Sequence, residues 1–288
     1  MNKNINGFEL YTQTPNTLSK GCLYTYKIRL EGLNNDEERL IRVYLPSNYE
    51  FDNPNKRYPV MYMMDGKNLF DHHTSFVGEW QVDETIEELV SENKKGFIVV
   101  GIDSAIDGNH RFLEMLINSN SLREKRLINS QLVQGELLAS HVFKTIKPLI
   151  DKTFNTLPDK ENTAVGGSSM GGLFAFYLGM KYKELVSYSL CFSPAFSLYT
   201  RKGFLEELKQ VKNLKEECGK FFFWIGNVNL DKELKGATLD AYDELVKLGY
   251  DTSKARIVYD SCGDHNEYSW KEYYKLAVNW WKNDNINQ

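Results

Sequence analysis

The order of apolar and polar positions along the chain predicts strands that alternate with helices over its later part. Short runs rich in Val, Ile, Phe, Tyr and Met, bounded by turn residues, are typical of sheet strands. These runs cover residues 23–30, 40–45, 60–64, 97–102, 163–167, 187–192, 221–225 and 255–259. We therefore expect an α/β fold with a mostly parallel, doubly wound sheet and helices on both faces. The hairpin-like first pair of runs predicts an antiparallel start.

Length and composition indicate one large domain. The chain has 288 residues, of which 42% are hydrophobic and 26% charged, so it can bury a full core. We expect residues 1–288 to form a single α/β domain. Residues 105–134 are polar and weakly periodic, and a long segment of this kind over an active face is typical of a lid or a substrate-binding segment.

Charge and cysteine usage exclude several classes of partner. The net charge is −4 and the pI about 5.8, so no basic face is expected and nucleic acid is excluded as a partner. Residues 1–8 lack the apolar stretch of a signal peptide, and no run approaches the roughly 18 apolar residues of a membrane span. The four cysteines are scattered without metal-ligand spacing, as reduced thiols are. We expect a cytoplasmic protein without a membrane partner, and its oligomeric state stays open.

One segment carries candidate chemistry, residues 163–172, with the sequence T-A-V-G-G-S-S-M-G-G. It reads as a strand, a sharp G-x-S-x-G turn and the start of a helix, the context of a nucleophile elbow. Gly167 and Gly171 lack Cβ atoms, so the backbone can bend tightly and present the Ser169 hydroxyl. Ser169 is therefore the predicted nucleophile, the alternative being a small-residue turn that only packs a helix on a strand.

A histidine follows the last predicted strand, as such a nucleophile requires. The chain has only five histidines, and His265 lies on the loop between residues 255–259 and a Trp/Tyr-rich helix. In α/β-hydrolases the chain order is nucleophile, acid, histidine, and His265 stands where that order demands.

Together these stretches resemble the putative esterase family of α/β-hydrolases, which includes esterase D, feruloyl esterases, siderophore esterases and the mycobacterial mycolyltransferases. The resemblance rests on residues 58–71 (Y-P-V-M-Y-M-M-D-G-K-N-L-F-D), residues 78–83 (G-E-W-Q-V-D), the elbow, residues 193–196 (S-P-A-F), and H-N-E at 265–267 followed by Trp270. The D-G-x-N-L-F-D and H-N-E-x-x-W stretches are most similar to the bacterial branch that holds siderophore esterases. The resemblance implies an α/β-hydrolase fold, and no cofactor is expected.

Acyl transfer needs fixed donors for the negative charge that develops on the carbonyl oxygen. The first predicted donor is the N–H of Met170, directly after the nucleophile, and the second belongs to the loop after residues 60–64. By resemblance to the D-G-L turn of the mycolyltransferases, that second donor is Lys67. Gly66 is expected to let the backbone approach the substrate, and Asp65 either to bind a substrate hydroxyl or to hold the loop.

The acid is where the chain departs from its relatives. Many family members carry Asp or Glu about three residues after the glycine that ends the preceding strand, and here that position holds Asn229. We predict Asp231 as the acid, because a carboxylate both orients an imidazole and stabilises its charged form. A weaker Asn229–His265 pair or a dyad stays open, and Asp260 and Asp264 are further candidates.

Other residues are assigned more weakly. Arg111 and Glu114 form an R-x-x-E element that resembles one beside the active site of siderophore esterases. They would hold the lid as an ion pair or meet an anionic substrate, although such a spacing is typical of helix-surface pairs. Trp80 is expected near the pocket rim. Residues 71–73 (D-H-H) do not predict a metal site, because adjacent side chains point in different directions.

These residues predict a serine carboxylic-ester hydrolase that acts on a small-molecule ester. The substrate would be an acylated carbohydrate, a hydroxycinnamoyl or acetyl ester, or a siderophore ester. An acyltransferase that uses a sugar hydroxyl instead of water is a variant. A non-catalytic binding protein is the alternative from another class, because a fold does not fix function.

Overall fold

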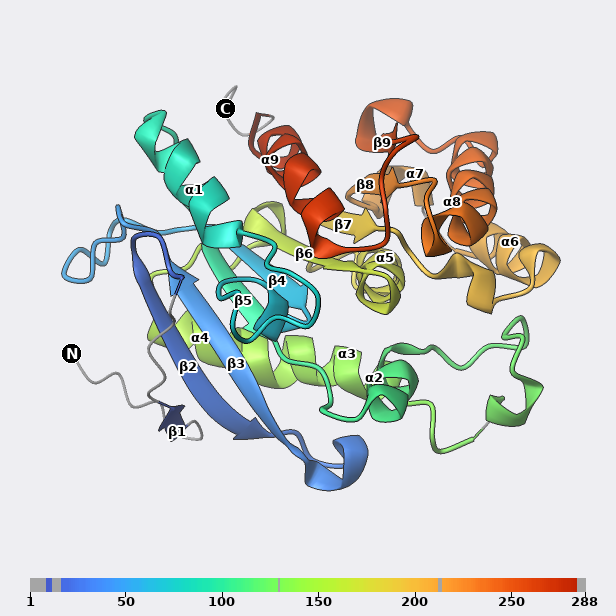
Figure 1. The fold of residues 1–288 in the computed structure, drawn as a ribbon, viewed down its shortest axis with the longest axis horizontal. Coiled ribbons are helices and arrows are strands. Elements are labelled where there is room, and N and C mark those ends of the chain that lie inside the picture. Colours follow the sequence, from blue (N-terminus) through green and yellow to red (C-terminus); the bar gives the residue numbers. More distant parts are fainter. Residues whose placement is uncertain (1–8, 12–16, 129, 212–213, 284–288) are drawn as a thin grey trace.

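A computed structural model describes residues 9–11, 17–128, 130–211 and 214–283, and a nine-stranded sheet runs through it (Figure 1). The strand order is β1-β2-β3-β5-β4-β6-β7-β8-β9. The strands are β1 (Glu9–Tyr11), β2 (Cys22–Arg29), β3 (Glu38–Leu45), β4 (Val60–Met64), β5 (Ile98–Ile102), β6 (Thr163–Ser168), β7 (Tyr188–Phe192), β8 (Lys220–Ile225) and β9 (Ala255–Tyr259).

The pairing confirms the predicted fold class. β1, β2, β3 and β5 pair antiparallel in that order, and every pair from β5 through β4 to β9 is parallel. β1 is an addition to the predicted strands. It spans three residues and pairs with β2 at the edge of the sheet. A run of three residues is too short to show the alternation of apolar and polar positions that predicts a strand.

Helices cover both faces of the sheet. They are α1 (Val82–Ser91), α2 (Gly108–Met115), α3 (Gly135–His141), α4 (Lys147–Thr153), α5 (Met170–Lys181), α6 (Arg201–Lys209), α7 (Leu214–Glu217), α8 (Leu230–Lys247) and α9 (Glu267–Asn283). α1 and α9 pack on one face, as Figure 1 shows, and α2 to α6 and α8 pack on the other. No helix in the described part of the chain is long and apolar enough to cross a bilayer.

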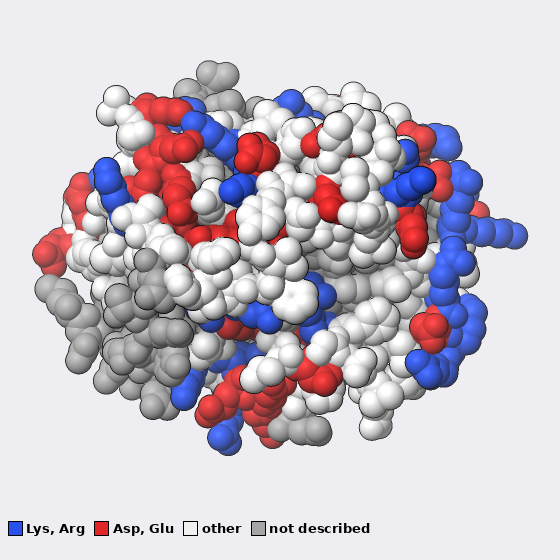
Figure 2. All heavy atoms as spheres, in the orientation of Figure 1, with Lys and Arg blue, Asp and Glu red and all other residues white. Residues whose placement is uncertain are grey.

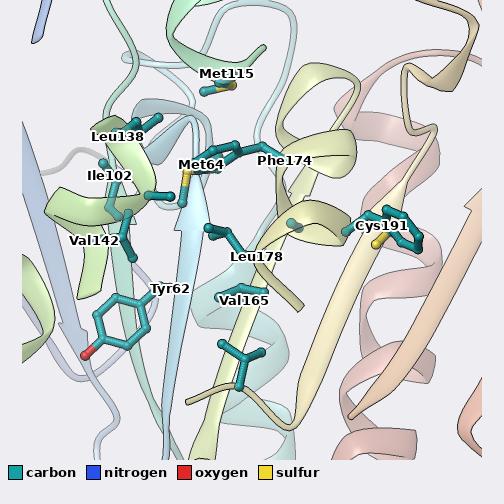
Figure 3. Close-up of a cluster of buried hydrophobic side chains, with 14 of the residues drawn as sticks. Tyr62, Met64, Ile102, Met115, Leu138, Val142, Val165, Phe174, Leu178 and Cys191 are labelled. Atoms are coloured by element: carbon teal, nitrogen blue, oxygen red, sulfur yellow. The ribbon is translucent and has the colours of Figure 1, made fainter. Parts of the chain in front are cut away.

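The central strands are buried on both sides, which explains their unbroken apolar runs. All five residues of β4 are buried, and successive side chains face opposite layers. Tyr62 and Met64 join the cluster drawn in Figure 3, together with Phe174 and Leu178 of α5. Met61 packs on the other face, in the cluster that includes residues of α1 and α9. Two apolar layers therefore hold the carboxyl ends of the parallel strands in place.

Candidate active site

The candidate nucleophile lies at the junction of β6 and α5. Ser169 adopts φ 56° and ψ −118°, and a sparsely populated conformation of this kind costs a non-glycine residue on the order of 1–3 kcal/mol. Its N–H donates to the Phe192 carbonyl at 2.9 Å, and its carbonyl accepts from the Ala195 N–H at 3.1 Å, so the turn is held from both sides. A Cβ atom at Gly167 would lie 2.7 Å from the Gly171 carbonyl carbon, which explains the need for glycine there.

A buried carboxylate faces the histidine of the last loop. His265 Nδ1 lies 2.6 Å from Asp231 Oδ1, and Asp231 is fully buried in the first turn of α8. Asp231 Oδ2 accepts from Ser193 Oγ at 2.8 Å and from the Gly226 N–H at 3.0 Å. With Nδ1–H donating to the carboxylate, Nε2 is the imidazole atom left to exchange a proton.

Trp270 supports this arrangement from a second side. Its ring meets the His265 ring at a centroid distance of 5.2 Å and an angle of 82°. Its Nε1–H donates at 2.9 Å to the Ser193 hydroxyl that itself donates to Asp231. The imidazole, the carboxylate, the serine hydroxyl and the indole thus form one connected network.

The other candidates for the acid have different partners. Asn229 Nδ2 donates to Asp264 Oδ2 at 2.9 Å, and Asp264 Oδ1 accepts from the His265 backbone N–H at 2.7 Å. Asp260 accepts from the Cys262 N–H and from the Tyr273 hydroxyl. The structure therefore places Asp231, and not Asn229, against the imidazole ring.

Ser169 and His265 line one open pocket with a volume of about 390 Å³. Such a volume suits a small ligand. Its polar lining side chains include Asp65, Lys67, Asn68, Arg111 and Glu267, and its apolar ones include Phe76, Val77, Ile106 and Trp270. Of the segment expected to be a lid, Ala105, Ile106, Gly108 and Arg111 line the pocket.

The two predicted oxyanion donors lie in the first turns of helical segments. Met170 is the first residue of α5, and Lys67 is the second residue of the 3-10 turn Gly66–Asn68. The first N–H groups of a helix lack partners within it, so both positions offer free donors. The Lys67 carbonyl accepts from the Thr74 hydroxyl at 2.6 Å, which holds its loop in place.

Asp65 and Arg111 form a two-pronged ion pair beside the pocket. Arg111 Nε and one terminal nitrogen each donate to an Asp65 oxygen at 2.7 Å. Burial acts to raise the pKa of Asp65, but the charge and hydrogen bonds of Arg111 outweigh it, so that pKa lies below its ordinary value. Asp65 therefore ties α2 to the loop after β4, the second of its two expected roles.

Three residues predicted to contact the substrate do not line this pocket. Glu114 is 1% exposed and binds Arg39 at 2.6 Å, not Arg111. Trp80 was expected near the rim but is buried, and its ring packs against that of Trp270 at a centroid distance of 5.6 Å. A Cβ atom at Gly66 would lie 2.6 Å from the Gly101 carbonyl carbon, so glycine here allows the loop to approach β5 closely.

Ser193, Asn68 and Glu267 belong to the site although the motifs gave them no role. Ser193 bridges Asp231 and Trp270, and Asn68 Nδ2 donates to Glu267 Oε1 at 2.9 Å. Burial raises the pKa of Glu267, and the Asp65 charge adds to this effect. All three lie within stretches that carry the family resemblance, which was the available signal.

One group in the described part of the chain has the spacing of metal ligands. It consists of Glu79, Asp83 and Glu84, and none of these three residues lines the pocket. The group is therefore not part of the pocket that holds Ser169 and His265.

Comparisons with known proteins identify the family and the fold. The family model described as "Putative esterase" matches residues 34–287. The structure is similar to that of a ferulic acid esterase, with TM-score 0.66 and 15% identity over 92% of this chain and 99% of the other. The structure is also similar to that of ferric enterobactin esterase from Salmonella typhimurium, with TM-score 0.68 and 18% identity. This match covers 96% of this chain but only 61% of the esterase chain.

The siderophore hydrolase EstB from Aspergillus nidulans gives TM-score 0.62 and 16% identity over 92% of this chain and 97% of the other. At these identities the likeness shows a shared fold. No curated protein sequence matches the chain.

Proposed function

The chain belongs to the putative esterase family of carboxylic ester hydrolases, and we propose that it cleaves its substrate through an acyl-enzyme on Ser169. The observation that carries the proposal is the 2.6 Å contact between His265 Nδ1 and buried Asp231, on a histidine that shares its pocket with Ser169. This is the relation of base and orienting acid that activates a serine hydroxyl.

In the first half of the reaction, Ser169 Oγ attacks the ester carbonyl carbon and its proton passes to His265 Nε2. Asp231 stabilises the resulting imidazolium. The N–H groups of Met170 and Lys67 donate to the oxyanion. The bond to the alcohol oxygen then breaks, and the alcohol leaves with the proton from His265.

The second half repeats these steps with water. Water gives a proton to His265 Nε2 and attacks the acyl carbon. The bond to Ser169 Oγ breaks, the serine recovers the proton, and a carboxylic acid leaves. The strained conformation of Ser169 keeps its hydroxyl at the pocket throughout.

The apolar side chains that line the pocket favour an ester with an aromatic acyl group. Phe76 and Ile106 border the pocket with 81% and 88% of their surfaces exposed, and exposed apolar side chains of this kind mark binding sites. Arg111 and Glu267, which also line the pocket, can bind phenolic hydroxyls. The ferulic acid esterase that shares the fold is named for such an acid. The proposed substrates are hydroxycinnamoyl and hydroxybenzoyl esters.

The test combines covalent labelling with turnover. We expect a fluorophosphonate to label Ser169 in wild-type protein, as read by peptide mass spectrometry, and Ser169→Ala to lose both the label and hydrolysis of p-nitrophenyl acetate and methyl ferulate. The loss should be at least about 10⁴-fold in kcat/KM. Methyl ferulate should be the better substrate of wild-type protein.

Ser187→Ala is the matched control, because the Ser187 hydroxyl donates to the Glu161 carbonyl near the surface and Ser187 does not line the pocket. It should keep the label and most of the activity. Absence of label and turnover in wild-type protein would overturn the serine mechanism and favour a binding protein. Labelling with turnover of acetate alone would overturn only the aromatic specificity.

A further inference from the structure

Asn68 ends the turn that carries the second proposed oxyanion donor, Lys67. This oxyanion turn, Gly66–Asn68, is a 3-10 segment of three residues. Its closing hydrogen bond, from the Leu69 N–H to the Gly66 carbonyl, is 3.3 Å long. Hydrogen bonds of a 3-10 turn are poorly aligned, so such a short segment holds its own N–H groups only weakly. The direction of the Lys67 N–H therefore depends on the contacts that hold the ends of the turn.

The side chain of Asn68 is hydrogen-bonded at both of its polar atoms. It is 8% exposed, its Oδ1 accepts from the Phe76 N–H at 3.1 Å, and its Nδ2 donates to Glu267 Oε1 at 2.9 Å. One partner is a donor and the other an acceptor, which fixes the orientation of the amide. The Asn68 carbonyl also accepts from the Trp80 N–H at 2.9 Å. Asn68 is thus held in one orientation by three different segments.

Glu267 belongs to the other half of the site. It follows His265 by two residues, begins α9 and is 4% exposed. α9 begins near the middle of the view in Figure 1, where Figure 2 shows mostly uncharged atoms at the surface. A carboxylate buried at such a place requires a hydrogen-bond donor, and Asn68 supplies one.

The hydrogen bond between Asn68 and Glu267 joins the two loops of the site. Its residues are 199 positions apart in the chain. The first is the neighbour of Lys67, and the second lies two residues after His265. Asp231 orients the imidazole ring at 2.6 Å, whereas the bond between Asn68 and Glu267 ties the loop that carries this ring to the oxyanion turn.

We propose that Asn68 and Glu267 are positioning residues, whose hydrogen bond places the Lys67 N–H and the His265 imidazole so that both act on one ester carbonyl. The inference rests on the proposed serine mechanism, in which the oxyanion and the proton on Nε2 form in the same step. A group displaced by about 1 Å from its productive place can cost about 100-fold in rate. In this role neither side chain touches the reacting atoms.

Two other roles would leave different signatures. A bond that only stabilises the fold would lower the Tm when broken and leave kcat of the folded protein intact. A contact between Glu267 and a phenolic hydroxyl would raise KM for methyl ferulate but not for p-nitrophenyl acetate, whose acyl group carries no hydroxyl. A positioning role lowers kcat for both substrates.

The test is a double-mutant cycle on hydrolysis of p-nitrophenyl acetate by the full chain. Asn68→Ala and Glu267→Ala should each lower kcat by about 10- to 100-fold, with KM little changed. The double variant should lose about as much as either single variant, because the same hydrogen bond is lost in all three. Glu267→Gln keeps an acceptor oxygen for Asn68 and should recover most of the kcat that Glu267→Ala loses.

Asn53→Ala is the matched control, because Asn53 Nδ2 makes the same kind of bond to Glu50 Oε2, at 2.7 Å, on the surface. Its kcat should equal that of wild-type protein. Each rate is divided by the amount of Ser169 that a fluorophosphonate labels at completion, so that unfolded protein does not count as a loss of kcat. If Asn68→Ala does not fold, Glu267→Ala and Glu267→Gln still make the comparison.

Single variants that keep the wild-type kcat, or losses that multiply in the double variant, would overturn the proposal. A raised KM without a loss of kcat would also overturn it and would assign Glu267 to substrate contact alone. If wild-type protein is neither labelled nor active, the proposed function itself fails, and the positioning role fails with it.

Discussion

Asp231 and Asp83 occupy equivalent places in two helices but have opposite surroundings. Both are fully buried in the first turn of a helix, and the residues before those helices, Asn229 and Gln81, have φ values of 48° and 54°. Asp231 meets donors on both oxygens and a histidine that can become positive. Asp83 accepts from the N–H and the hydroxyl of Ser19 on one oxygen and lies beside two other carboxylates, Glu79 and Glu84.

The comparison separates burial from function. Burial and a helix amino end are common to both carboxylates, so neither explains a role in catalysis. What differs is the source of positive charge that each environment provides. Asp231 faces an imidazole that can carry a positive charge, whereas burial raises the pKa values of Asp83 and Glu84 and favours their protonated forms.

The largest effect should come from removing the charge of Asp231. Asp231→Asn is expected to lower kcat/KM for ester hydrolysis by about 10³- to 10⁴-fold, because an amide neither fixes the productive imidazole tautomer nor stabilises imidazolium. Asp240→Asn is the control, as Asp240 lies on the same helix and pairs with Arg201 at the surface. A loss of less than about tenfold, on the same scale of catalytic effects, would favour a dyad. Steady-state kinetics on p-nitrophenyl acetate decides between these outcomes.

A smaller effect is expected from Ser193. Ser193→Ala removes a donor to Asp231 and the acceptor of the Trp270 N–H, so a buried indole is left unpaired. The expected loss in the free energy of unfolding is about 1–3 kcal/mol, measured by urea denaturation, with a kcat that falls less than in Asp231→Asn. Ser187→Ala removes a hydroxyl that binds the Glu161 carbonyl near the surface and should cost less. If the two variants lose the same free energy of unfolding, the network around Asp231 contributes no more to stability than a hydrogen bond near the surface.

Local patterns predicted the strands and the elbow well. The bounds of β4 and β9 agree with the predicted runs, because a buried strand reveals itself by its own side chains. Gly167 is dictated by contacts within the same turn, so the motif contains its own explanation. Asp231 was predicted because a carboxylate both orients an imidazole and stabilises its charged form, and it lies against the His265 ring although the family's usual position holds Asn229.

Partners brought together by the fold were not predictable in the same way. The R-x-x-E spacing is typical of a pair on a helix surface, yet Arg111 reaches Asp65 and Glu114 reaches Arg39 on other elements. Trp80 was placed at the rim because of its neighbours in sequence, but burial of its large ring decides its position.

The smallest effect concerns the pH dependence of stability. The raised pKa values of Glu79 and Glu84, about 7 and 8, mean that the folded protein holds protons that the unfolded chain releases near pH 4.5. The free energy of unfolding should therefore be highest below about pH 4.5 with respect to these groups and fall as pH rises to about 8. Glu84→Gln removes one titrating group and the repulsion of Asp83, so its curve should be flatter.

Thermal unfolding between about pH 5 and 8 measures this difference. Because Glu84 is partly exposed, solvent screening limits the expected divergence of the two curves to about 1 kcal/mol. Burial also raises the pKa of Glu114 to about 7, but this group is common to both proteins and cancels in the comparison. If stability falls with pH equally steeply in wild-type protein and in Glu84→Gln, Glu84 is not a source of the pH dependence.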